Sequence, residues 1–197
     1  MDKNWIGNNK SAYTTLGASN HSIEDRQLYD YYATDPKCLD DLFDREIFSD
    51  NIWECACGEG HLSKRMIVEY NKKVYSSDII NRGYGEIKDF LCITNQEWEG
   101  DIITNPPYKY AYEFIDKSLK VIPKGYKVAM FLKVLFLEGQ KRKKFFNHNP
   151  PKVVYVYSKR QMCAKNGEFE KYKSNAIAYA WYVWEKGYKG DTIIKWI

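Results

Sequence analysis

Short apolar runs alternate with amphipathic stretches along most of the chain. The apolar runs predict strands at 52–56, 73–77, 101–104, 126–132, 153–157, 176–184 and 192–197. The amphipathic stretches predict helices at 36–48, 61–70, 110–122 and 135–147. Strands that alternate with helices indicate an open, doubly wound α/β sheet, mostly parallel. The last strands follow one another without helices, which predicts antiparallel additions at one edge.

The polar pattern divides the chain into two parts. Residues 1–27 are rich in Asn and Ser and have few core-forming positions, so we expect a flexible N-terminal arm. Residues 28–197 carry all the predicted elements and form one domain by length.

Composition and charge narrow the class of protein only a little. Aromatic residues make up 16% of the 197 residues, which argues against disorder, and the net charge of +4 suits a polyanionic partner without requiring one. The five cysteines favour reduced thiols and a cytoplasmic location. No apolar run approaches the ~20 residues of a membrane span. The three histidines have no partners at metal-ligand spacing, so no metal is expected.

The most informative segment is the predicted strand 101–104 with the Asn105-Pro106-Pro107-Tyr108 corner that follows it. Proline cannot donate a ladder hydrogen bond, so the strand must end there. The side-chain oxygen of Asn105 and the carbonyl of Pro106 can accept both hydrogens of one planar amine, while the Tyr108 ring lies flat on the group that carries it. An ordinary turn is the competing interpretation, because Asn and Pro are common turn residues.

Three further features lie where the strands of such a sheet would present a ligand. Gly58 and Gly60 follow the first strand of the sheet and let the backbone approach a ligand closely, although a plain tight turn has the same pattern. Asp78 ends the next strand and can accept hydrogen bonds from both hydroxyls of a ribose, or can simply cap a turn. Asp89 and Phe90 can bond an adenine amine and stack on its ring, or can end an amphipathic segment.

The order and spacing of these features resemble those of the amino-methyltransferases that carry an Asn-Pro-Pro-Tyr motif. The resemblance implies the class I methyltransferase fold, S-adenosylmethionine as the cofactor and an exocyclic amine as the acceptor. It also implies that the cofactor contacts segment 30–36, the glycine turn and the corner. The residues so implied are Thr34, Pro36, Glu54, Ala56, Gly58, Gly60, Asp78, Asp89, Phe90 and Asn105.

Several segments are similar to small DNA adenine methyltransferases of phage and prophage type, among them 15–20, 131–133, 157–160 and 180–184. This similarity implies that adenine N6 in DNA is methylated after base flipping. The chain departs from the commonest motif at Glu54, where Asp is frequent, and at Cys55 and Cys57. Glu54 still preserves the acid that would face the methionine ammonium.

The element that reads DNA must be small, because only about 45 residues separate Gly60 from Asn105. Two basic segments are candidates for phosphate contacts, with a solvated surface as the alternative. The first contains Lys141 and Arg142, and the second contains Lys159 and Arg160.

Three other functions stay open at this point. An RNA adenine methyltransferase or a protein-glutamine methyltransferase would use the same corner on another substrate. A module that only binds nucleic acid could keep the same fold, although binding alone would not require Asn105 and Tyr108 together.

Overall fold

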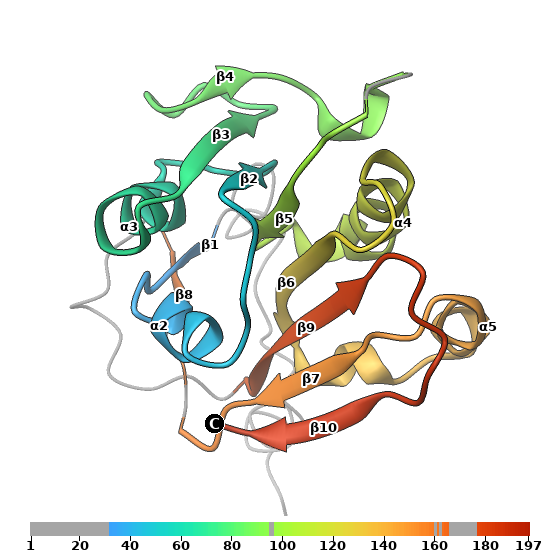
Figure 1. Ribbon diagram of the computed structural model, residues 1–197. Coiled ribbons are helices and arrows are strands. Elements are labelled where there is room, and N and C mark those ends of the chain that lie inside the picture. Colours follow the sequence, from blue (N-terminus) through green and yellow to red (C-terminus); the bar gives the residue numbers. More distant parts are fainter. Residues whose placement is uncertain (1–31, 95–96, 160, 162, 166–176) are drawn as a thin grey trace, which may run out of the picture.

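The computed structural model describes residues 32–94, 97–159, 161, 163–165 and 177–197. The predicted arm at 1–27 lies outside these residues. Eight strands form one sheet in the order β10-β7-β9-β6-β5-β2-β3-β4 (Figure 1). Their bounds are β2 Asn51–Glu54, β3 Lys73–Asp78, β4 Glu86–Ile87, β5 Asp101–Thr104, β6 Lys127–Lys133, β7 Val153–Val156, β9 Tyr179–Glu185 and β10 Ile193–Trp196.

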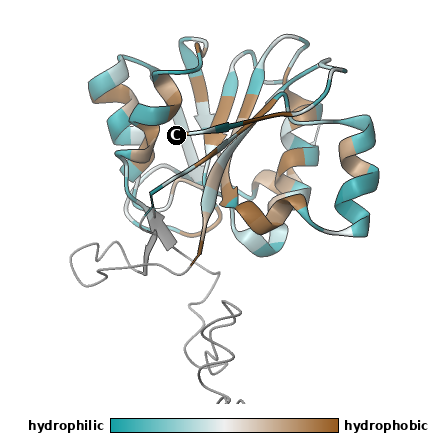
Figure 2. Ribbon diagram, turned by 90° about the horizontal axis from the view of Figure 1, so that it is seen from below, coloured by the Kyte–Doolittle hydropathy of each residue, from teal (hydrophilic) through white to brown (hydrophobic). Residues whose placement is uncertain are grey.

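Helices cover both faces of this sheet, which gives three layers (Figure 2). The helices α2 (Cys38–Phe43) and α3 (His61–Tyr70) pack on one face, and α4 (Ala111–Val121) and α5 (Gln140–His148) pack on the other. Three short 3₁₀ helices complete this part of the chain, namely η3 Phe90–Cys92, η4 Tyr108–Tyr110 and η5 Val134–Leu137.

The two apolar cores follow directly from the alternation of side chains along the strands. In β9, Tyr182 and Trp184 lie in the core beneath α4 and α5, whereas Trp181 and Val183 lie in the core beneath α2 and α3. A strand that is buried on both faces reads as a continuous apolar run, which is why β6 and β9 were recognisable in the sequence.

The sheet confirms the predicted fold class and refines its C-terminal part. Strand β9 runs antiparallel to both of its neighbours, β6 and β7, while the edge strand β10 runs parallel to β7. The antiparallel strand is therefore inserted inside the sheet, and the edge itself is parallel. Because β2, β3, β5 and β6 are parallel, their carboxyl ends meet at one edge.

Two predicted helices differ from those observed. The helix expected at 36–48 ends at Phe43, after which the chain turns so that Phe48 is buried in the core. The helix expected at 135–147 is interrupted at Gly139, whose φ of 123° is incompatible with a continuing helix. The first half becomes η5 and the second half becomes α5.

A small antiparallel pair was not expected from the sequence. Strand β1 (Tyr32–Thr34) pairs with β8 (Cys163–Lys165), in the register Thr34 to Cys163. Strand β1 belongs to the segment that the resemblance implies to contact the cofactor. It thus lies beside β8, which follows the second basic segment in the sequence.

Candidate active site

The carboxyl ends of β2, β3 and β5 gather most of the predicted site residues. Strand β2 is hydrogen-bonded to β3 on one side and to β5 on the other. Glu54, Asp78 and Thr104 are the last residues of these three strands. The structure therefore brings the glycine turn, the acid and the Asn-Pro-Pro-Tyr corner to the same edge.

Asp78 holds the glycine turn in place. Its Oδ2 accepts a hydrogen bond of 2.8 Å from the backbone N–H of Gly58, and its Oδ1 accepts one of 3.0 Å from that of Ile80. Gly58 has a φ of 54°, in the region that glycine adopts at little cost. Each carboxylate oxygen has two lone pairs, so Asp78 can still accept two ligand hydroxyls.

Glu54 lies beneath the turn and is only 2% exposed. Its carboxyl accepts a hydrogen bond from the Ser63 hydroxyl, which lies 2.6 Å from that of Ser76. The pKa of Glu54 is raised to about 8, mainly by burial and to a smaller extent by the nearby charge of Asp78, against the lowering effect of the hydrogen bonds from Ser63. Glu54 is therefore mostly protonated at neutral pH and would become ionised beside a cation.

Gly60 has a structural reason to be glycine. Its φ is 77°, and a Cβ at this position would clash with the ring of Tyr84. Lys64 in turn places its ammonium 4.9 Å from the centre of that ring. The loop after β3 thus packs against the start of α3, and Ala56 lies half-buried before the turn.

The corner begins where β5 ends, as predicted. Asn105 is half-buried, Pro106 is buried, and the Pro107 carbonyl accepts a 2.8 Å hydrogen bond from the N–H of Tyr110. This bond starts η4 and places the half-buried Tyr108 ring 6.0 Å from the ring of Tyr179. The corner is a defined structure and not an exposed loop.

Two buried hydroxyls near the predicted site have no hydrogen-bond partner in the described part of the chain. They are Oγ1 of Thr34, at the end of β1, and Oγ1 of Thr104, at the end of β5. Leaving a buried hydroxyl without a partner costs about 1–3 kcal/mol. A bound ligand could satisfy such groups, and the contact of Thr34 with the cofactor stays a prediction. Pro36 lies half-buried just before α2.

Asp89 and Phe90 are placed differently from one another. Asp89 is half-buried and caps η3, since its Oδ1 accepts a hydrogen bond of 2.9 Å from the N–H of Leu91. Phe90 is 2% exposed and packs edge-on against Trp53 at 5.1 Å and against Phe114 at 5.3 Å. The ring is thus almost fully enclosed by the core, and its stacking on adenine stays a prediction. The sequence could not show which way the ring points.

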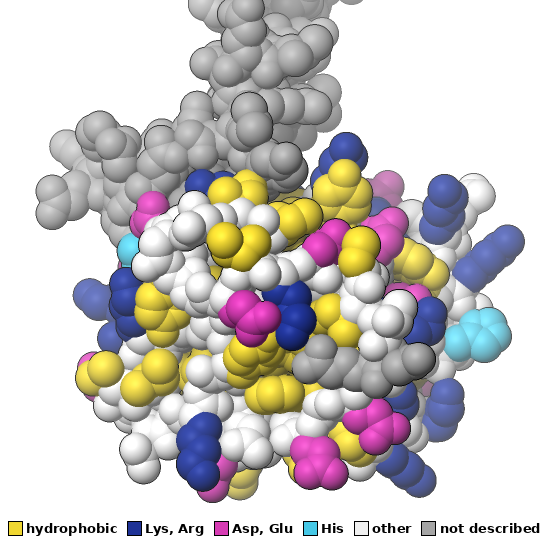
Figure 3. Space-filling model, turned by 90° about the horizontal axis from the view of Figure 1, so that it is seen from above, with side chains coloured by type: hydrophobic (Ala, Val, Ile, Leu, Met, Phe, Trp, Pro, Cys, Tyr) yellow, Lys and Arg dark blue, Asp and Glu magenta, His cyan; other side chains and the backbone are white. Residues whose placement is uncertain are grey.

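Helix α5 carries the first predicted basic segment. Lys141, Lys143 and Lys144 are exposed, and Figure 3 shows Lys and Arg side chains along the side of the molecule where α5 lies. Arg142 is half-buried over the Phe136 ring at 5.0 Å. Of the second segment, Lys159 is exposed and Arg160 lies outside the described residues.

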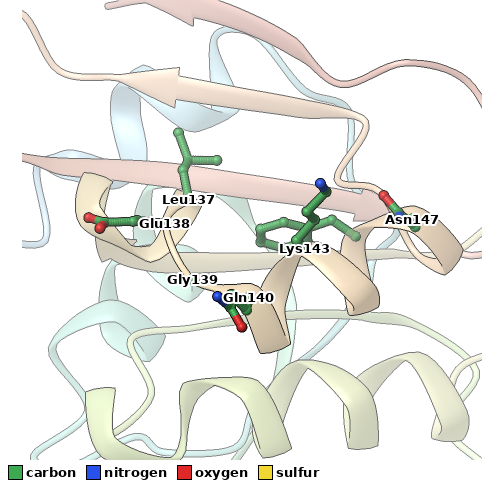
Figure 4. A pocket seen from close by; sticks show the side chains of 7 residues that line it. Leu137, Glu138, Gly139, Gln140, Lys143 and Asn147 are labelled. Atoms are coloured by element: carbon green, nitrogen blue, oxygen red, sulfur yellow. The ribbon is translucent and has the colours of Figure 1, made fainter.

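An open pocket lies where η5 meets α5 (Figure 4). Gly139 is at its rim, and helix α5 contributes the polar side chains of Gln140, Lys143 and Asn147. Leu137 and Phe146 add apolar surface. None of the residues of the Asn-Pro-Pro-Tyr corner lines this pocket.

Two residues at the same edge were missed by the sequence interpretation. Ile79 is 50% exposed immediately after Asp78, an unusual position for a large apolar side chain beside an acid. Lys133 ends β6 and places its ammonium 5.0 Å from the centre of the Tyr108 ring. The sequence did offer a signal for Ile79, because it is an apolar residue directly after Asp78. Nothing in the sequence pattern pairs Lys133 with Tyr108.

Metal-binding groups and membrane-spanning helices are both missing from the part of the chain that the structure describes. No group of His, Cys, Asp or Glu side chains that could hold a metal ion occurs among residues with described positions. In the same part of the chain, no helix is both long and apolar enough to cross a bilayer.

Comparison with known proteins identifies the fold. No protein family and no curated protein matches the sequence. Among solved structures, the chain is similar to a Listeria monocytogenes protein assigned to the class I S-adenosylmethionine-dependent methyltransferases, with a TM-score of 0.60, 13% identity, and coverage of 93% of this chain and 70% of that one. It is also similar to a Pyrococcus horikoshii protein assigned as an RNA methyltransferase, with a TM-score of 0.53, 12% identity, and coverage of 90% and 98%.

A third similarity is to the type IIG restriction endonuclease BpuSI, with a TM-score of 0.55 and 13% identity; it covers 90% of this chain but 27% of that one. At such identities the similarities concern the fold alone. The chain has the class I S-adenosylmethionine-dependent methyltransferase fold, as its sequence predicted.

Proposed function

We propose that this protein is an S-adenosylmethionine-dependent methyltransferase that methylates an exocyclic amine, adenine N6 in DNA. The observation that carries the proposal is the position of the Asn105-to-Tyr108 corner. It ends β5 at the same edge as the glycine turn and Asp78. An amine held at the corner would therefore lie beside a cofactor held at the turn.

The cofactor would be held by groups that the structure leaves available. Asp78 would accept the ribose hydroxyls, and Asp89 the adenine amine. The Thr34 hydroxyl and the Glu54 carboxyl would face the methionine end, where the ammonium would favour the ionised form of Glu54. We assign Phe90 a packing role beneath the site, and Ile79 is the exposed apolar surface next to Asp78.

The corner would activate the amine by holding both of its hydrogens. The Asn105 side-chain oxygen and the Pro106 carbonyl would accept one each, which draws the nitrogen lone pair out of conjugation with the ring. Bound S-adenosylmethionine supplies a methyl group on a positively charged sulfur. The amine nitrogen held by Asn105 and Pro106 would accept this methyl group and would then release its surplus proton to solvent. Positioning of the two reactants would supply most of the rate.

A nucleic-acid substrate is favoured by the basic surface of α5. Its exposed lysines would bind phosphates without regard to sequence. Two proteins of similar fold are an assigned RNA methyltransferase and a restriction endonuclease, which are nucleic-acid enzymes by name. A duplex base would be flipped out so that it can stack on Tyr108.

Mass spectrometry of nucleosides tests this proposal. DNA and RNA from cells that express the wild-type chain would be digested and compared with those from cells that express Asn105→Ala. We expect N6-methyladenine in DNA with the wild type only. N6-methyladenine found only in RNA would mean that the substrate is RNA and not DNA. Methylcytosine in DNA, or no difference between the wild type and Asn105→Ala in either nucleic acid, would contradict the proposal.

A further inference from the structure

Lys133 occupies a rigid position at the proposed site. It is the last residue of β6 and pairs with Tyr179 of β9 across the antiparallel ladder. Its carbonyl accepts a hydrogen bond of 3.2 Å from the hydroxyl of Tyr182, which is itself buried in the core. The backbone of Lys133 is therefore fixed. Because β5 and β6 are parallel neighbours, Lys133 lies at the same edge of the sheet as the Asn-Pro-Pro-Tyr corner that follows β5.

The ammonium of Lys133 differs from those of the other half-buried lysines. In the described part of the chain, each of the others donates to a protein oxygen: Lys72, Lys88, Lys117, Lys127, Lys152 and Lys186. For Lys133, these described residues include no carboxylate within ion-pair distance and no hydrogen-bond acceptor for its Nζ. Its contact is the face of the Tyr108 ring, 5.0 Å from the centre.

The Lys133 side chain is half-buried, and among the described residues its ammonium has only an aromatic face beside it. A cation over a tyrosine ring gains about 0.5–2 kcal/mol, whereas a charged hydrogen bond to an anion gains about 1.5–3 kcal/mol. The charge is therefore available to an anionic group that enters beside Tyr108. Lysine suits phosphate in this setting, because its ammonium is a compact point charge on a flexible stem.

We propose that Lys133 binds the backbone phosphate that flanks the nucleotide whose base stacks on Tyr108. This inference rests on the proposed function and deepens it, since it makes a phosphodiester part of what the site recognises. The flanking phosphate is joined to the stacked base through a single sugar, so a cation against the stacking ring is in a position to reach it. A free base or a peptide amide lacks this group.

The test compares three variants with the wild type. Lys133→Met removes the charge and keeps the length of the side chain, and Lys133→Arg restores the charge. Lys109→Met is the matched control, because the exposed Lys109 makes a similar contact of 5.1 Å with the neighbouring Tyr110 ring. Fluorescence anisotropy with a labelled oligonucleotide measures Kd over a range of salt concentrations. Tritiated methyl transfer measures KM and kcat, and thermal melting measures stability.

We expect Lys133→Met to raise the oligonucleotide Kd and KM about tenfold. The slope of log K against log salt should become shallower by about 0.7–0.9, the loss of one phosphate contact. Cofactor affinity and melting temperature should stay at wild-type values, Lys133→Arg should recover most of the binding, and Lys109→Met should behave like the wild type.

The remaining outcomes separate this inference from the proposed function. An unchanged Kd and salt slope in Lys133→Met would overturn the role of Lys133. A loss in Lys133→Met that is confined to melting temperature or kcat would also overturn this role, since Lys133 would then only hold the Tyr108 ring in place. Wild-type protein that binds oligonucleotides without methylating them would contradict the proposed function, while the salt slope would still report on Lys133. Wild-type protein that neither binds nor methylates them would contradict both.

Discussion

Two carboxyl groups at the carboxyl edge of the sheet have contrasting surroundings. Glu54 is buried with a hydroxyl as its hydrogen-bond donor, so its neutral form is favoured. Asp78 accepts two backbone N–H groups and remains partly accessible. The same edge therefore offers an acid that can ionise when a cation binds and an acid that can accept hydroxyl groups.

The raised pKa of Glu54 predicts a specific pH dependence of stability. The folded state holds this proton more tightly than the unfolded chain, so the stabilisation is full below the ordinary pKa of glutamate and is lost as the pH rises through about 8. Glu54→Gln stays neutral throughout. Its free energy of unfolding relative to the wild type should thus increase from pH 5 to pH 9 by a few kcal/mol, at about 1.4 kcal/mol per pKa unit.

Urea denaturation at each pH measures this difference. Glu69→Gln, an exposed glutamate on α3, serves as the control. A difference between Glu54→Gln and the wild type that is constant with pH would show that burial does not hold Glu54 in its neutral form.

Asp78 should govern cofactor affinity. Asp78→Ala removes the acceptor for the Gly58 N–H together with any bond to the cofactor. Each charge-assisted hydrogen bond is worth about 1.5–3 kcal/mol, so S-adenosylmethionine should bind tenfold or more weakly. Asp78→Asn, which keeps one oxygen, should lose less. Calorimetric titration that finds wild-type affinity in Asp78→Ala would remove Asp78 from the cofactor site.

At the scale of elements, the sequence was most informative where one local rule decides the outcome. Strand β5 ends at Thr104 because Pro106 and Pro107 cannot continue a ladder, and this end was predicted to the residue. The pairing of β1 with β8 joins segments about 130 residues apart, and no local pattern in such short strands specifies it. The direction of the Phe90 ring likewise depends on Trp53 and not on its sequence neighbours.

Strand β5 is fixed at its other end by Asp101. This carboxylate is 3% exposed and accepts hydrogen bonds from the N–H groups of Ser49, at 2.5 Å, and Lys127, at 2.6 Å. Asp101→Ala would leave both part-buried donors without this partner, at about 1–3 kcal/mol each. We expect a loss of about 2–5 kcal/mol in the free energy of unfolding, measured by denaturant titration.

Asp50→Ala is the control for Asp101→Ala. Asp50 lies nearby, but its side chain is 86% exposed, so its loss should cost less than about 1 kcal/mol. Equal effects of the two substitutions would contradict the proposed fixing of β5 by Asp101.

At the scale of the whole molecule, the two ends of the sheet carry different groups of residues. The carboxyl end holds the proposed site and the start of α5, whereas the amino end carries lysines that are remote from it. Sequence periodicity could predict this layered plan because five of the eight strands of the sheet, namely β2, β5, β6, β7 and β9, are mainly buried. It could not predict which lysines share the end that holds the site, since that depends on how the strands are ordered in the sheet.

The basic surface of α5 should account for part of the salt dependence of nucleic-acid binding. Changing Lys141, Lys143 and Lys144 together to Gln should make the slope of log K against log salt shallower by about 2, because each phosphate contact contributes about 0.7–0.9. A matched triple change at the amino end, in Lys73, Lys120 and Lys124, should have little effect. Anisotropy titrations at several salt concentrations would measure both slopes, and equal slopes would mean that α5 is only a solvated surface.

The most direct measurement of the central claim is methyl transfer by Asn105→Ala to DNA, made beside calorimetric binding of S-adenosylmethionine by the same protein. Asn51→Ala, an exposed asparagine at the opposite end of the sheet, is the control. Removing one preorganised contact to a reacting group costs about 3 kcal/mol, so transfer should fall at least about a hundredfold while cofactor affinity stays within a few-fold of the wild type. Wild-type transfer by Asn105→Ala would contradict the account, because the corner would then be a turn and not the group that holds the amine.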